Sequence, residues 1–119
     1  GGTGNPGWDC SGLTQAALNT IGIKVKHSAF SQLNDPQGKS LPITVTLANA
    51  KAWLQPGDLV FPYAPLPGGN KTSVGDHVAI YSGNGNIIEA ARPGTNVREV
   101  PLYGIFAVRR FQPTIVMSN

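Results

Sequence analysis

Residues 77–90 read HVAIYSGNGNIIEA, two apolar runs on either side of a turn made of glycine and asparagine. These two residues adopt the left-handed backbone that tight turns between antiparallel strands need, so the stretch predicts a β-hairpin with its turn at residues 83–86. Upstream, Gln-Pro-Gly-Asp at 55–58 predicts a turn that leads into a strand at 59–61. Downstream, residues 97–102 and 105–111 predict two more strands, and together these elements form an antiparallel meander.

The first half of the chain predicts helix instead of strand. Apolar residues recur there at steps of three and four before a glycine, which indicates an amphipathic helix over residues 11–21: Leu13, Ala16, Ala17, Ile21 and Gly22. A second short helix is expected around residues 28–33. Prolines and a glycine at positions 36, 38 and 42 break any long element in the rest of residues 24–52. A helix followed by an antiparallel sheet is an α+β arrangement.

The composition indicates one small domain over residues 1–119, which we expect to be excised from a longer protein. One cysteine excludes an internal disulfide and a zinc site of several cysteines. The net charge of +3 comes from lysines and arginines spread along the chain without interleaved aromatic residues, which disfavours a nucleic-acid partner. No apolar stretch reaches the length of a membrane span.

The single cysteine, Cys10, lies where the predicted first helix begins. A lone cysteine is more often a small buried hydrophobic residue than a reactive one. At the first turn of a helix, however, unpaired backbone N–H groups favour the thiolate, which is the form that attacks carbonyl groups. Cys10 is therefore a candidate nucleophile.

A cysteine nucleophile works with a histidine that takes its proton and a third group that orients the imidazole ring. Of the two histidines, His27 lies in a segment without a pattern and is interpreted as a solvated surface residue. His77 begins a strand, where a rigid backbone can aim the ring, and is the predicted base. Asp76 precedes His77 in the sequence, but its side chain is expected to point in a different direction. It is interpreted as a loop or ligand residue.

Glu89 places a charge inside the apolar run of the second hairpin strand and is the candidate third member. Faces alternate along a strand, so Glu89 and His77 share a face only if the connection holds an odd number of residues, for instance 82–86. That connection pairs Ala79 with Glu89 and leaves His77 as the diagonal neighbour, about 7 Å away. An even connection would make Glu89 an exposed strand residue with no role in the mechanism.

Three segments together resemble the NlpC-type family of papain-like cysteine peptidases that cut peptidoglycan stem peptides. They are residues 8–13 (Trp-Asp-Cys-Ser-Gly-Leu), 55–61 and 77–85, and the resemblance covers about residues 1–110. It implies a papain-like fold in which the helix that carries the nucleophile packs on a twisted antiparallel sheet. It also implies a set of catalytic and substrate-binding residues: Cys10, His77 and Glu89 for catalysis, and Trp8, Asp9, Ser11 and Asp76 for the substrate, with Asp9 and Ser11 at its free amino end. Histidine is more common in the family at the position of Glu89.

The function expected from this resemblance is hydrolysis of the bond between D-γ-glutamate and the diamino acid, through an acyl-enzyme and without a metal or organic cofactor. The partner is a peptidoglycan stem peptide, the place of action is extracellular or in the cell wall, and the protein is expected to be a monomer. Two alternatives remain open. One is a wall-binding module of the same fold with weak or no catalysis, and the other is a papain-like amidase or acyltransferase.

Overall fold

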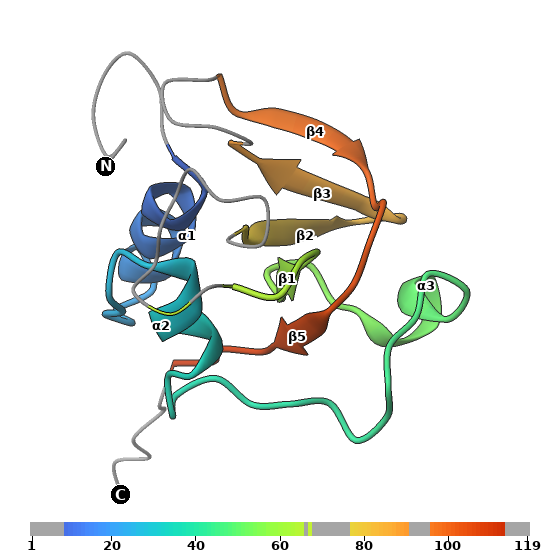
Figure 1. Ribbon diagram of the computed structural model, residues 1–119, viewed down its shortest axis with the longest axis horizontal. Coiled ribbons are helices and arrows are strands. Elements are labelled where there is room, and N and C mark those ends of the chain that lie inside the picture. Colours follow the sequence, from blue (N-terminus) through green and yellow to red (C-terminus); the bar gives the residue numbers. More distant parts are fainter. Residues whose placement is uncertain (1–8, 66, 68–76, 91–95, 114–119) are drawn as a thin grey trace, which may run out of the picture.

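The computed structural model describes residues 9–65, 67, 77–90 and 96–113. Within these ranges the chain forms an α+β fold in which the strands make one antiparallel sheet of order β4-β3-β2-β1-β5 (Figure 1). The elements are α1 (Cys10–Asn19), α2 (Ala29–Leu33), α3 (Ala50–Trp53), β1 (Leu59–Phe61), β2 (Ala79–Gly83), β3 (Asn86–Glu89), β4 (Arg98–Pro101) and β5 (Ala107–Arg109). The predicted class, the turn at 55–58, the hairpin and the short helix near residue 30 are confirmed.

The last strand departs from the predicted meander. Strands β1 to β4 are neighbours in chain order, but β5 returns to the other edge of the sheet and pairs with β1 (Figure 1). All three residues of β1 are buried, so an unpaired edge there would leave backbone N–H and C=O groups without partners. By pairing Val60 with Val108, β5 supplies those partners.

Helix α1 begins at the cysteine because Asp9 is its N-cap: one carboxylate oxygen of Asp9 accepts the backbone N–H of Gly12 at 2.8 Å. Beyond the helix, Gly22 takes the left-handed conformation (φ +82°), and Ile23 N–H donates to the carbonyl of Leu18. This is the glycine-terminated end that the sequence predicted, although the helix itself stops at Asn19.

The buried face of α1 differs from the expected one. The buried positions are Cys10, Ser11, Gly12, Thr14 and Leu18, whereas Ile21 is 48% exposed. A polar residue can occupy this face because its hydroxyl has partners: Thr14 Oγ1 donates to the side-chain oxygen of Gln32, which is fully buried in α2. The apolar spacing alone could not reveal that partner.

Two layers of side chains cover the sheet. Leu59 and Phe61 pack in one cluster with residues of α1 and α2, while Val60, between them, packs in a second cluster with residues of α3 and the segment before it. Figure 1 shows α1 and α2 together on one side of the strands and α3 on the other. Sequence reasoning did not predict α3, which has only four residues. In the described residues, no helix is long and apolar enough to cross a membrane.

Candidate active site

The hairpin register brings His77 and Glu89 together. Ile80 pairs with Ile88 and Tyr81 with Ile87, so one step further the register places Ala79 opposite Glu89, as predicted. His77 Nε2 lies 2.9 Å from Glu89 Oε1, and both residues are buried. The diagonal placement anticipated from the sequence is confirmed.

A bulge in β2 makes this register possible. Asn84 and Gly85 have φ values of 57° and 82°, which is the pattern of a two-residue turn, and such a turn alone gives an even connection. The register shifts between Tyr81 and Gly83, so β2 holds one extra residue and the connection becomes odd. The Tyr81 hydroxyl accepts the N–H of Gly85 at 2.8 Å and fixes the turn.

Glu89 is the centre of a buried polar network. Its Oε1 also accepts the Tyr103 hydroxyl at 2.7 Å, and its Oε2 accepts Nε and a terminal nitrogen of Arg98 at 3.3 and 3.0 Å. Arg98 lies directly opposite on β4. Burial raises the pKa of Glu89, but the hydrogen bonds from Tyr103, His77 and Arg98 more than offset this and hold it below its ordinary value. At 1% exposure, Glu89 is not the exposed strand residue of the alternative interpretation.

Two tyrosines lie against the His77–Glu89 pair, Tyr63 near the histidine ring and Tyr103 on the glutamate. The Tyr63 ring centroid lies 6.4 Å from that of His77 and 6.2 Å from that of Tyr103. Burial and the hydrogen bond to Glu89 raise the pKa of Tyr103, so its hydroxyl remains a donor at neutral pH. Both tyrosines are 41% exposed, so each contacts the buried pair and also reaches solvent.

Cys10 is the first residue of α1 and is 4% exposed. It belongs to the same hydrophobic cluster as Val78, the residue after His77, and α1 packs against β2. The histidine does not begin the strand, as the sequence predicted, but lies two residues before β2, the strand against which α1 and its cysteine pack. A buried structural cysteine would have the same exposure, so the distinguishing feature is its place at the amino end of a helix that packs against the strand after His77.

The other predicted site residues divide into two groups. Asp9 and Ser11 flank Cys10 and are fully buried, and in the described part of the chain the hydroxyl oxygen of Ser11 has no hydrogen-bond partner. Trp8 and Asp76 lie outside the described residues. Where the structure does describe the chain, no three His, Cys, Asp or Glu side chains form a group that could hold a metal ion.

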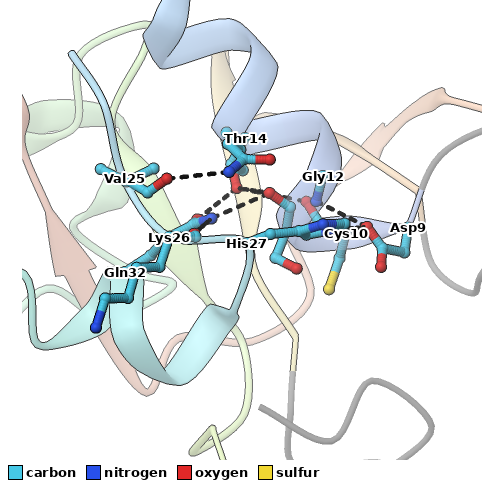
Figure 2. A network of polar contacts seen from close by, with 10 residues as sticks. Asp9, Cys10, Gly12, Thr14, Val25, Lys26, His27 and Gln32 are labelled. Carbon is cyan, nitrogen blue, oxygen red and sulfur yellow. Dashed lines mark hydrogen bonds and ion pairs between the residues drawn. The ribbon is translucent and has the colours of Figure 1, made fainter. Parts of the chain in front are cut away.

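The interpretation of His27 as a solvated surface residue is wrong. Its side chain is 24% exposed, and its Nε2 lies 2.6 Å from Oδ1 of Asp9 (Figure 2). Sequence reasoning also missed Arg98, Tyr103 and Tyr63. The β3–β4 pairing would have revealed Arg98, but nothing in the local pattern marks the two tyrosines.

Comparisons with known proteins show which family the chain belongs to. The model of the NlpC/P60 family matches residues 1–112. The chain is 34% identical over 101 residues to peptidoglycan endopeptidase RipA of Mycolicibacterium smegmatis, and 37% identical over 101 residues to a γ-D-glutamyl-L-lysine dipeptidyl-peptidase of Bacillus cereus. Each match covers 85% of this chain but only 17% and 26% of the two relatives, so the chain spans about a quarter of their length or less.

Solved structures show the same fold. Three structures of RipA, mutated at a cysteine, at a histidine and at a glutamate, match with TM-scores of 0.63, 0.64 and 0.62 and identities of 31%, 32% and 29%. They cover 88%, 91% and 88% of this chain and 43%, 45% and 43% of their own. The family model, the relatives and the solved structures thus lead to one conclusion: the chain belongs to the NlpC/P60 family.

Proposed function

We propose that this domain is a cysteine endopeptidase that hydrolyses peptidoglycan stem peptides between D-γ-glutamate and the diamino acid. The observation that carries the proposal is the buried His77–Glu89 pair, with Nε2 and Oε1 2.9 Å apart, beside the helix that begins at Cys10. The printed names of the two relatives, a peptidoglycan endopeptidase and a γ-D-glutamyl-L-lysine dipeptidyl-peptidase, support the substrate class.

The mutated RipA structures support the choice of residues. They are mutated at a cysteine, a histidine and a glutamate, the three residue types proposed here, and the last two lie 12 positions apart in RipA. His77 and Glu89 have the same separation. This agreement favours a Cys-His-Glu triad over the version with histidine in the third position.

In the proposed mechanism, each nitrogen of the imidazole has its own role. Glu89 is ionised, because its pKa is lowered, so its Oε1 accepts a hydrogen bond that the Nε2–H of His77 donates. The basic nitrogen is then Nδ1, which takes the proton from the Cys10 thiol. The thiolate attacks the γ-glutamyl carbonyl, first-turn N–H groups of α1 stabilise the oxyanion, and His77 protonates the leaving amine. Water activated by the same imidazole then releases the acyl group.

Asp9 and Ser11 are the proposed contacts for the free amino end of the stem peptide. A buried hydroxyl without a partner is unfavourable by about 1–3 kcal/mol, and a substrate group that bonds to Ser11 would remove that penalty. Trp8 and Asp76 complete the proposed substrate site. We further propose that the domain acts on the cell wall from outside the cytoplasm and as a monomer.

The experiment is digestion of purified sacculi, followed by mass spectrometry of the soluble products. We expect fragments that begin with the diamino acid from the wild type and none from Cys10→Ser. Glu99→Gln, a change on the exposed face of β4, serves as the active control. Cleavage at another bond would instead favour an amidase, and binding to sacculi without soluble products would favour a wall-binding module. Either result would refute the proposal.

A further inference from the structure

A second histidine–carboxylate pair lies at the amino end of α1. Oδ1 of Asp9 is 2.6 Å from His27 Nε2 and also accepts the N–H of Gly12 at 2.8 Å. Both contacts use the same oxygen, and the Asp9 side chain is 1% exposed. Figure 2 shows Asp9, Cys10 and His27 together at the first turn of the helix.

The position of His27 is set by α1 and α2, not by the loop alone. From α1, Gln15 donates its side-chain N–H to the carbonyl of Val25, two residues before His27. From α2, the side-chain nitrogen of Gln32 donates to the carbonyl of Lys26, directly before His27, and to that of Ser11 in α1 (Figure 2). These bonds fasten residues 25–32 to the helix that carries the cysteine, and His27 is the side chain in this segment that reaches the N-cap.

Two hydrogen bonds to the same oxygen, from Gly12 and from His27, restrict the orientation of the Asp9 carboxylate more than the helix cap alone does. The bond from His27 comes from a different segment than the Gly12 N–H, so it restricts rotation of the carboxylate about its side-chain bonds beyond what the cap does. Asp9 directly precedes Cys10, so its orientation also sets the conformation of the turn from which the sulfur projects. Misplacement of a reacting group by about 1 Å can reduce a rate by about 100-fold.

We propose that His27 is a positioning residue: through Asp9, it holds the amino-terminal turn of α1 in the geometry that the nucleophile requires. Its effect on turnover rests on the proposed function, but its effect on the Cys10 thiol does not. The side chain donates its Nε2–H to Asp9 and is not required to touch the substrate.

The test compares two replacements of His27. Glutamine keeps a side-chain N–H donor at similar reach, whereas leucine removes the donor at similar size. The readouts are the rate of Cys10 alkylation by iodoacetamide and kcat/KM on a purified stem peptide. We expect His27→Leu to reduce kcat/KM about tenfold and alkylation at least about threefold, and His27→Gln to stay within about twofold of the wild type in both. Lys24→Leu, an exposed change in the same segment, should leave both rates unchanged.

A double-mutant cycle separates positioning through Asp9 from general destabilisation. In an Asp9→Ala background, His27→Leu should reduce the alkylation rate by less than about twofold, because the carboxylate that His27 bonds to is already absent. Multiplicative losses would overturn the proposal, as would an unchanged His27→Leu or a His27→Gln that is as impaired as His27→Leu. If His27→Leu does not fold, His27→Asn, which is too short to reach, takes its place. A wild type that leaves sacculi intact would refute the proposed function, while the alkylation series would still decide the role of His27.

Discussion

Replacing Glu89 by glutamine is the most informative change to the buried network. Glutamine has the same shape but one acceptor oxygen and one NH₂ group. If its oxygen takes the place of Oε1, it keeps the bonds from Tyr103 and His77, while its NH₂ group faces the guanidinium of Arg98. The substitution therefore removes the charge and leaves most of the geometry intact.

The expected loss of stability follows from these contacts. A hydrogen bond to a charged group is about twice as strong as a neutral one, so the two retained bonds lose roughly 1 kcal/mol together. The Arg98 side chain is 62% exposed, so solvent screens its ion pair, and the loss there is below about 1 kcal/mol. Glu89→Gln should therefore reduce the free energy of unfolding by about 1–2 kcal/mol at pH 7.

The sign of the pH dependence provides a second check. Because the folded protein holds the pKa of Glu89 below its ordinary value of 4.5, the ionised carboxylate stabilises the fold above that pH. This stabilisation is lost as the pH falls through the folded-state pKa, and the glutamine variant has no such titration. The difference between the two proteins should thus shrink below about pH 4.

Urea unfolding at several pH values between 3 and 7 measures both quantities. The control is Glu99→Gln, the same chemical change on an exposed residue of β4, which should alter the unfolding free energy by less than about 0.5 kcal/mol. A Glu89→Gln effect as small as the control, or one of equal size at pH 3 and pH 7, would show that the charge of Glu89 does not organise the network.

Three further substitutions test other parts of the structure. Tyr103→Phe removes a donor to Glu89, so it should reduce the unfolding free energy by about 1 kcal/mol and move the acid-induced loss of stability to higher pH in urea titrations. Arg110→Gln leaves the buried Asp58 carboxylate without its two 2.8 Å guanidinium bonds, and should lower the unfolding free energy by about 3 kcal/mol by calorimetry. Gly57→Ala forces a side chain into a left-handed position (φ +97°) with open space around it, so it should cost about 1 kcal/mol by strain alone, and a neutral result would contradict the turn geometry.

The sequence predicted those features that depend on local chemistry. The Asn84-Gly85 turn, the glycine that ends α1 and the buried carboxylate at Glu89 each follow from conformational preference or from the cost of burying charge. The requirement for an odd connection was also correct, although the extra residue that satisfies it is a bulge in β2 and not part of a longer turn.

The missed features depend on contacts between distant segments. The return of β5 to β1, the polar face of α1 and the bond between His27 and Asp9 are fixed by partners 18 or more positions away in the chain. Periodicity within one element carries no information about such partners. For the same reason a histidine in an unpatterned loop was interpreted as a surface residue.

Cys10 is proposed as a nucleophile whose thiolate is stabilised by the His77 ring once that ring has taken the thiol proton. The direct measurement is the rate of Cys10 alkylation by iodoacetamide at pH 6.5, where an ordinary thiol, half-ionised near pH 8.5, is about 1% thiolate. We predict ready alkylation of the wild type and a rate at least about tenfold lower in His77→Ala. A wild-type thiol that resists alkylation, or that reacts equally fast without His77, would contradict the role of Cys10 as a nucleophile activated by His77.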